Sequence, residues 1–181
     1  MEDEQWLVQR AQESSEQFST LYFRYIDRIY AYVQRETGDT AVTEDIVSAT
    51  FEKALKNLPG YQWQGVSFGA WLYKIARNEI NTHYRKGRWT IPLLDRFIHP
   101  TQVEHVVQAN DQMDEISLAI QQLSARDQEI IRLHYFEELT HTELAEVLGC
   151  STYNVAVRLH RALTRLRKQL NYSAQEVVIN A

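Results

Sequence analysis

Residues that break regular structure are rare in this chain, and their scarcity limits the possible folds more than any other sequence feature. Only three prolines and six glycines occur among 181 residues. A β-sandwich or barrel needs many turns that contain glycine or proline. Long stretches rich in Ala, Leu, Glu, Gln and Arg favour helices instead. The sequence therefore predicts an all-α protein.

The first half of the chain shows the three-and-four apolar spacing of amphipathic helices. One such stripe begins at Phe18 and is expected to end at Gly38. A second helix is expected over Val42–Leu58, with Glu44 and Asp45 in its first turn, where carboxylates favour the helix dipole.

A third helix is expected to begin after Ser67, which can cap it. Its buried stripe comprises Phe68, Trp71, Leu72, Ile75, Ala76 and Ile80. At about 100° per residue, the half of the helix opposite that stripe carries Lys74, Arg77, Asn81, Arg85 and Arg88. Residues 61–90 hold five cations and one anion, although the chain as a whole has a net charge of −5. This local excess of positive charge predicts a patch that binds a polyanion. A solvated helix face is the alternative interpretation.

Periodicity is lost between Trp89 and Met113, a stretch that contains two of the prolines and is typical of a linker. The predicted organisation is a helical domain over 1–88, a linker over 89–113, a second helical domain over 114–172 and a C-terminal tail over 173–181.

The second domain has the spacing of a helix-turn-helix between residues 141 and 160. Ser124 and Thr140 are each followed, three residues later, by an acidic residue, as in a capping box. Gly149 is expected in a left-handed turn, and the last helix is expected from Thr152 to about Leu170.

The side of this last helix opposite its apolar stripe is polar. It carries Tyr153, Asn154, Val157 and Arg161, with Arg158 beside them and Arg165 near the edge. Amide and guanidinium groups at the start of a helix match base edges in a DNA major groove. An ordinary helical hairpin with a charged face is the alternative interpretation.

Several motifs, in order along the chain, together resemble one family. They are Phe18-Ser-Thr-Leu-Tyr22, the segment 44–54, the segment 68–78 with Arg85-Lys86, the segment 123–131, and Arg158-Leu-His-Arg-Ala162. The chain resembles a bacterial extracytoplasmic-function (ECF) sigma factor of the sigma-70 class. This resemblance implies a two-domain helical subunit that gives RNA polymerase its promoter specificity and assists promoter melting.

The resemblance also implies roles for particular residues. Contact with the clamp helices of the largest polymerase subunit is implied for Asp45, Ile46, Val47, Thr50 and Phe51. Reading of the minus-ten element is implied for Tyr61, Trp63, Lys74, Arg77, Asn78, Asn81, Arg85, Lys86 and Arg88. Reading of the minus-thirty-five element is implied for Thr152, Tyr153, Asn154, Val157, Arg158 and Arg161. The flap of the second-largest subunit, promoter DNA and an anti-sigma factor are the other implied partners.

Two alternatives stay open for Tyr61 and Trp63, because each ring can stack on an unpaired base or cover the domain core. The chain also departs from the usual family pattern. Ser48 and Ala49 replace an amide and a carboxylate, Thr82 stands where Asp is common, and Ala156 stands where Lys is frequent.

Catalysis is not indicated. The six His and 24 acidic residues form no metal-ligand motif, and Cys150 is expected to be a small buried packing residue. We expect a non-enzymatic bacterial cytoplasmic protein with no cofactor and no membrane insertion. A one-component helix-turn-helix transcription regulator is the competing function.

Overall fold

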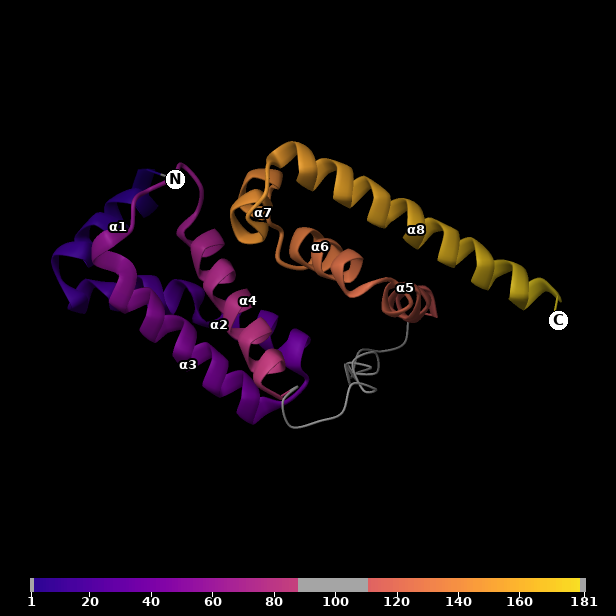
Figure 1. Cartoon of the computed structure of the whole chain (residues 1–181), viewed down its shortest axis with the longest axis horizontal. Helices are drawn as coiled ribbons and strands as arrows, with labels where there is room; N and C mark the ends of the chain where they lie inside the picture. Colours follow the sequence, from indigo (N-terminus) through magenta and orange to yellow (C-terminus); the bar gives the residue numbers. More distant parts are fainter. Residues whose placement is uncertain (1, 88–110, 180–181) are drawn as a thin grey trace. The chain divides into compact units, whose positions relative to one another are not determined.

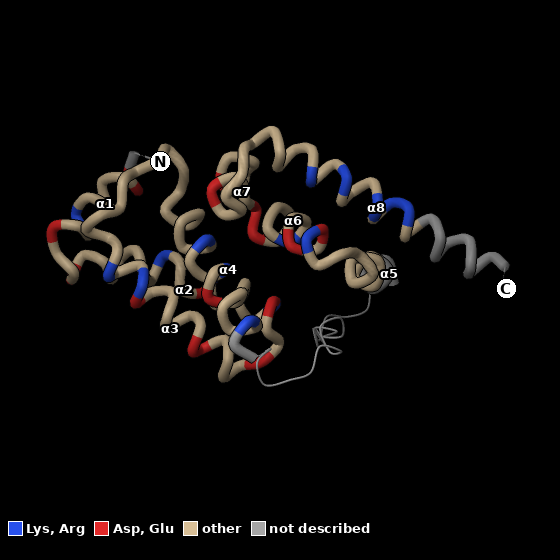
Figure 2. The backbone as a smooth tube through the Cα atoms, viewed as in Figure 1, with Lys and Arg blue, Asp and Glu red and all other residues tan. Residues whose placement is uncertain are grey.

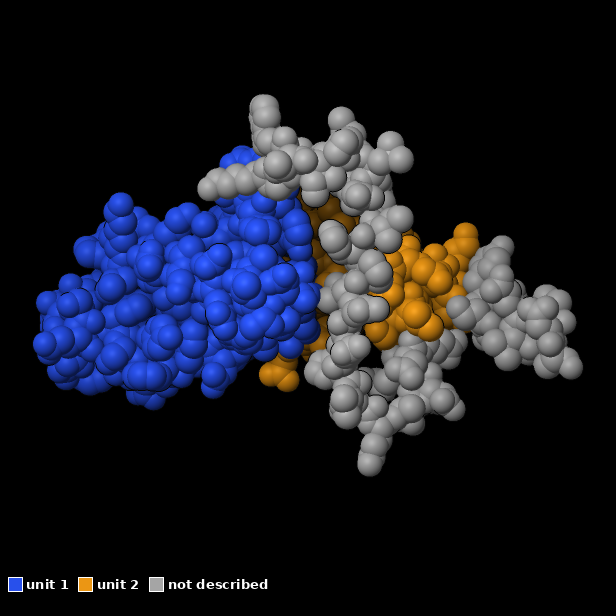
Figure 3. All heavy atoms as spheres, turned by 90° about the horizontal axis from the view of Figure 1, so that it is seen from below, with its two compact units in different colours: residues 1–103, 146–148 blue, residues 104–145, 149–181 orange. Residues whose placement is uncertain are grey.

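The structure, a computed structural model, describes residues 2–87 and 111–179. All regular secondary structure in these ranges is helical (Figure 1), which confirms the all-α prediction. The chain divides into two compact units, residues 1–103 with 146–148 and residues 104–145 with 149–181 (Figure 3). The predicted linker lies almost wholly outside the described residues.

The first unit is built from four α-helices and two short 3-10 helices. They are α1 (Glu2–Glu13), η1 (Ser15–Gln17), α2 (Phe18–Thr37), α3 (Thr40–Asn57), η2 (Leu58–Gly60) and α4 (Phe68–Gly87). The start of α2 and its end at Gly38 are as predicted. Gly38 has a φ of 67°, and its N–H donates to the Gln34 carbonyl at 2.9 Å. Left-handed glycine closes the helix because it carries no Cβ to clash.

The start of α3 differs from the prediction. Asp39 is the N-cap, and its side chain accepts a hydrogen bond from the Val42 N–H at 2.9 Å. The first turn therefore begins at Thr40, so Glu44 and Asp45 lie in the second turn. Because Asp39 supplies the carboxylate at the helix end, the predicted role of Glu44 and Asp45 in the first turn was wrong.

Apolar stripes of α2, α3 and α4 meet in the core of this unit. Phe18 of α2 and Phe51 of α3 are buried with ring centroids 6.5 Å apart. The ring centroids of Tyr32 in α2 and Tyr73 in α4 are 5.2 Å apart. Phe68, at the start of α4, is fully buried. These edge-to-face aromatic contacts join the helices that the sequence pattern predicts separately.

Helix α1 was not predicted. It buries Val8 and Ala11 and also the carboxylate of Glu4, which is only 7% exposed. Glu4 accepts hydrogen bonds from the Tyr25 hydroxyl and, at 3.3 Å, from the Phe68 N–H. Burial, together with the hydrogen bond to Glu4, raises the pKa of Tyr25 above its ordinary value, so the phenol stays protonated as a donor.

Gly69 provides a test of how closely α4 approaches α2. A Cβ at this position would lie 2.5 Å from Cε1 of the buried Tyr25 ring. Gly69→Ala should therefore destabilise the first unit by about 1–3 kcal/mol through overpacking, despite the better helix propensity of alanine. Urea denaturation followed by tryptophan fluorescence measures the change. Gly60→Ala is the matched control, since its Cβ would meet nothing within 4 Å, and equal effects of the two changes would contradict the prediction.

The second unit contains α5 (Asp111–Gln121), α6 (Ala125–Tyr135), α8 (Thr152–Ile179) and all of α7 (His141–Leu148) except residues 146–148. Helix α5 begins inside the predicted linker, and α8 continues beyond Leu170 into the predicted tail. The buried side of α8 carries Val155, Leu159 and Ala162, as the apolar spacing predicts. Among the described helices, none combines the length and apolarity that crossing a bilayer requires.

Candidate nucleic-acid interface

The helix-turn-helix is formed by α7, a short turn and α8. Thr140 and Glu143 make the complete capping box that the sequence predicts. The Glu143 N–H donates to the Thr140 hydroxyl at 3.3 Å, and the Thr140 N–H donates to the Glu143 carboxylate at 2.9 Å. Gly149 ends α7 with a φ of 64°, again as predicted. Leu144 and Val155 are fully buried, so each of the two helices is anchored by its apolar side.

The N-terminal half of α8 presents a polar surface to solvent. Tyr153 is 76% exposed, and Thr152, Asn154 and Arg161 are also exposed. The Ser151 hydroxyl accepts from the Asn154 N–H at 3.2 Å and so caps the helix start. Cations recur along the helix up to Lys168 (Figure 2). This surface has the donors and the positive charge that a duplex groove requires.

Two members of the predicted set on α8 are less accessible. Val157 and Arg158 are half-buried, whereas the other predicted readers of this helix are exposed. Direct contact with a partner is therefore easiest at Tyr153, Asn154 and Arg161.

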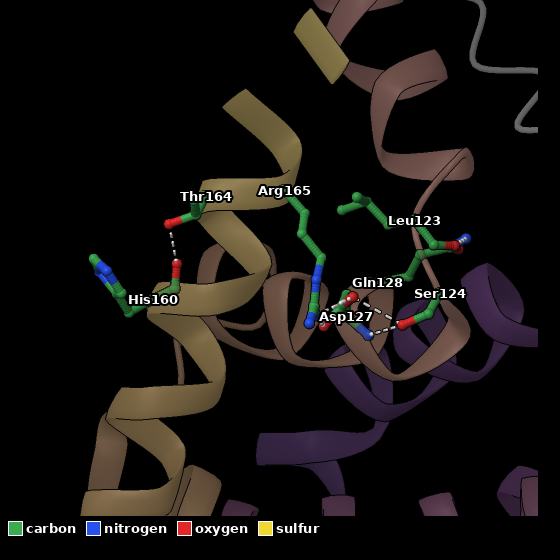
Figure 4. Close-up of polar contacts among 7 residues, drawn as sticks. All are labelled: Leu123, Ser124, Asp127, Gln128, His160, Thr164 and Arg165. Carbon is green, nitrogen blue, oxygen red and sulfur yellow. Dashed lines mark hydrogen bonds and ion pairs between the residues drawn. The ribbon is translucent and has the colours of Figure 1, made fainter. Parts of the chain in front are cut away.

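Arg165, at the edge of this surface, forms an ion pair within the unit. Its Nη1 donates to both carboxylate oxygens of Asp127 at 2.9 and 2.8 Å, across from α8 to α6 (Figure 4). Ser124 donates its hydroxyl proton to the same carboxylate at 2.8 Å. The prediction of Ser124 as a cap is confirmed, since it also accepts from the Asp127 N–H. The placement of Arg165 near the DNA-facing edge overlooked this ion pair.

The pair of Arg165 and Asp127 joins α8 to α6 but contributes little to the stability of the unit. The Arg165 side chain is 58% exposed and that of Asp127 12% exposed. An ion pair with one exposed partner contributes about 0.2–1 kcal/mol at most. Sequence reasoning gave Asp127 only a capping role, because its partner lies 38 residues away in another helix.

The loop between η2 and α4, residues 61–67, holds the two predicted aromatic readers. Tyr61 is half-buried, with its ring 5.5 Å from Phe68 and 4.6 Å from Trp71. Burial raises the pKa of Tyr61 to about 12. These contacts favour the interpretation that Tyr61 covers the core. Trp63 is also half-buried, whereas Gln62 and Gln64 beside it are exposed.

The predicted basic face of α4 is only partly open. Asn78, Asn81 and Arg85 are exposed, but Lys74 and Arg77 are half-buried. The expectation of one exposed face therefore holds for Asn78, Asn81 and Arg85 but not fully for Lys74 and Arg77. The Lys86 side chain and Arg88 lie outside the described residues.

The predicted polymerase-binding set on α3 is mostly core. Ile46, Val47, Thr50 and Phe51 are all buried, and the Thr50 hydroxyl donates to the Ile46 carbonyl at 2.7 Å. Side chains enclosed in this way are poorly accessible to a partner, so contact by these four with the polymerase stays a prediction. Only Asp45 of the set is exposed, and the outer side of α3 adds the exposed residues Glu44, Ser48, Glu52 and Lys53.

The remaining candidate side chains form no reactive cluster that the structure reveals. Cys150 is half-buried rather than fully buried. His141 and His160 are exposed, and the His141 ring lies 5.4 Å from His134. In the part of the chain that is described, no three His, Cys, Asp or Glu side chains are grouped as metal ligands would be.

Comparison with known proteins gives the family. The model for Sigma-70 region 2 matches residues 21–90, and the model for Sigma-70, region 4 matches residues 113–166. The ECF RNA polymerase sigma factor BldN of Streptomyces coelicolor is 30% identical over an alignment of 170 residues, which covers 91% of this chain and 64% of BldN. The RNA polymerase sigma factor YlaC of Bacillus subtilis is 29% identical over 86% of this chain and 93% of YlaC.

Solved structures share the fold. CnrH, solved with the cytosolic domain of CnrY, matches with a TM-score of 0.66 at 23% identity. The match covers 93% of this chain and 97% of the CnrH chain. The sigma factor RpoE of Bartonella quintana, solved with the anti-sigma factor NepR, has a TM-score of 0.62 at 24% identity, with coverages of 85% and 96%. The two family models match in the order region 2, then region 4, and the similar proteins named above are sigma factors as well. The chain belongs to the sigma-70 family of RNA polymerase sigma factors, and the relatives place it with the ECF type.

Proposed function

We propose that this chain directs core RNA polymerase to specific promoters and assists in melting them. The observation that carries the proposal is that each family-matched region presents a surface suited to a different form of DNA. Helix α8 offers exposed amide and guanidinium groups for a duplex groove. The 61–67 loop and α4 offer an aromatic ring and exposed polar groups for unpaired strands.

The minus-thirty-five element is assigned to α8. A major groove admits one helix, and base discrimination comes from the side chains at that helix's exposed face. Tyr153, Asn154 and Arg161 meet this requirement most directly. Thr152, Val157 and Arg158 complete the proposed surface at its margins.

The minus-ten element is assigned to the loop and to the outer face of α4. Unpaired bases stack on aromatic rings while cations follow the backbone. Trp63 is the proposed stacking ring, and Tyr61 supports the loop from the core side. The polar and basic members of the proposed surface are Lys74, Arg77, Asn78, Asn81, Arg85, Lys86 and Arg88.

Core polymerase is the principal proposed protein partner. On α3 the contact with the clamp helices of the largest subunit is assigned to Asp45 and the exposed residues beside it, while the second unit meets the flap of the second-largest subunit. An anti-sigma factor is a further proposed partner, which the complexes of RpoE with NepR and of CnrH with CnrY support by analogy.

The proposal divides the work between domains at 1–88 and 114–172, joined by 89–113. The chain itself catalyses no reaction, because bond formation belongs to the polymerase, and it works in the bacterial cytoplasm. Its net charge of −5 disfavours tight binding to duplex DNA without the polymerase. Run-off transcription from a genomic promoter library, with and without the chain, tests this. Transcripts that require the chain are expected, whereas tight sequence-specific repression by the isolated chain would support a one-component regulator instead.

Trp63→Ala should impair promoter opening more than closed-complex formation. Loss of one base-stacking interaction costs about 1–3 kcal/mol. Permanganate footprinting of the holoenzyme on promoter DNA measures the melted strand. Trp63→Phe, which keeps a ring, is the matched control and should open promoters nearly normally. If Trp63→Ala also opens them normally, the ring belongs to the core and not to DNA.

Arg161→Ala should weaken holoenzyme binding to the upstream duplex. A lost bidentate base contact costs about 1–3 kcal/mol and relaxes the preference at one base pair, whereas a lost phosphate contact weakens all sequences alike. Gel-shift assays on single-base variants of the element distinguish these outcomes. Arg167→Ala is the control. Arg167 follows Arg161 by six residues, which on an ideal helix is a rotation of about 240°, so the two side chains point in different directions from the helix axis. Unchanged binding by Arg161→Ala would remove this residue from the interface.

A further inference from the structure

Helix α1 touches the 61–67 loop at its beginning. The Gln12 side chain, half-buried, donates from Nε2 to the Leu58 carbonyl at 2.9 Å and to the Tyr61 carbonyl at 2.7 Å. The Tyr61 N–H donates in turn to the Leu58 carbonyl at 3.0 Å. One amide group thus ties the first residue of η2 to the first residue of the loop.

The same helix touches the end of the loop. Glu4 accepts from the Phe68 N–H at 3.3 Å, directly after Ser67, where the first amides of α4 have no partner within the helix. Its other carboxylate oxygen accepts from the Tyr25 hydroxyl. Arg24 lies 3.9 Å from that oxygen and balances part of its charge. Glu4 is therefore held in place from three sides.

Gln12 and Glu4 stand on one side of α1, eight residues and thus about 12 Å apart along its axis. In the middle of the loop that they bracket, Gln62, Gln64 and Gly65 are exposed and Trp63 is half-buried, whereas Val66 is buried in the core. Gly65 has a φ of 75°, a conformation that favours glycine. Two side chains of α1 thus hold the two ends of a loop whose middle is largely exposed.

We infer that α1 is a clamp for this loop, and that Gln12 and Glu4 are positioning residues that set Trp63 for the unpaired minus-ten strand. The inference rests on the proposed function of the loop. Neither residue needs to touch DNA. Loss of the clamp leaves the fold of α2–α4 in place but lets the loop sample other conformations, which weakens discrimination between bases at the minus-ten element alone.

Gln12→Glu tests the clamp, because it keeps the side-chain shape, removes both donors and turns a carboxylate toward two carbonyl oxygens. Gln9→Glu is the matched control, with the same chemical change at an exposed position of the same helix. Two lost hydrogen bonds should speed amide hydrogen exchange in residues 61–67 of the full chain by about tenfold, while Gln9→Glu leaves it unchanged. Circular dichroism checks folding, and Gln12→Met, which lacks the donors without adding charge, replaces Gln12→Glu if that variant unfolds.

The second measurement is run-off transcription by the holoenzyme on promoters with single-base changes. Gln12→Glu should lose discrimination at the minus-ten element and keep it at the minus-thirty-five element. Equal exchange in the loop, or equal loss at both elements, overturns the clamp. If the wild-type chain itself shows no minus-ten discrimination, the proposed function fails, and hydrogen exchange still decides whether α1 holds the loop.

Discussion

Phe68→Ala should lower the free energy of unfolding of the first unit by about 3–5 kcal/mol, the range for truncating a buried phenylalanine. Phe68 is fully buried, and its ring lies 5.5 Å from Tyr61, 5.2 Å from Trp71 and 6.2 Å from Tyr25. Removing it opens a cavity where the loop, α2 and α4 meet. The loss is large because three other rings lose a partner that they cannot replace by small movements.

The measurement uses urea denaturation followed by tryptophan fluorescence. The four tryptophans are Trp6, Trp63, Trp71 and Trp89, so the signal reports on the first half of the chain. Phe23→Ala is the matched control in the same unit, because Phe23 is 73% exposed and a surface change of this kind stays within about 0.5 kcal/mol. A loss below 1 kcal/mol for Phe68→Ala would contradict the central position of this ring.

Leu144→Ala should destabilise the second unit by about 2–5 kcal/mol. Leu144 is fully buried in α7, as is Val155 in α8, and α7 is too short to be stable without tertiary contacts. The cavity would loosen the helix-turn-helix and thus the orientation of the proposed reading surface. Holoenzyme binding to the upstream duplex should fall together with stability.

Far-UV circular dichroism during urea denaturation measures this change, with tryptophan fluorescence of the same samples as the reference for the first unit. Leu118→Ala is the control, since Leu118 is 59% exposed on α5 and its truncation leaves the transition nearly unchanged. A Leu144 variant whose dichroism transition matches that of the wild-type chain would show that α7 is not anchored through this side chain.

The helices were largely predictable from sequence because their signals are local. Apolar spacing over a few turns identified α2, α4 and α8, and the Thr140 and Gly149 signals gave both ends of α7. Helix α1 escaped this reasoning. Among its described residues, the buried side chains are Glu4, Val8 and Ala11. One of these three is a carboxylate, which sequence reasoning places in solvent, so the apolar stripe is too short to indicate a helix.

The candidate site was predictable as a set of segments but not residue by residue. Motif order identified the family, and the family implied which segments meet DNA and polymerase. The spacing of Ile46, Val47, Thr50 and Phe51 cannot say whether that side of α3 faces a partner or its own core. In the structure this side of α3 is buried in the core of the first unit, where the Phe51 ring packs against Phe18.

What the sequence by itself determined is therefore the helical class, most helix limits, the helix-turn-helix and the family. The helical class, the helix limits and the helix-turn-helix follow from local patterns, chiefly the spacing of residues three or four positions apart. The family follows from the resemblance of several motifs in their order along the chain. Tertiary structure alone decided that Tyr61 packs against Phe68 and Trp71, that Arg165 pairs with Asp127, and that Gln12 binds the start of the loop. The partners in the last two cases are separated by 38 residues and by 46 and 49 residues, and such pairs meet only when whole helices have found their neighbours.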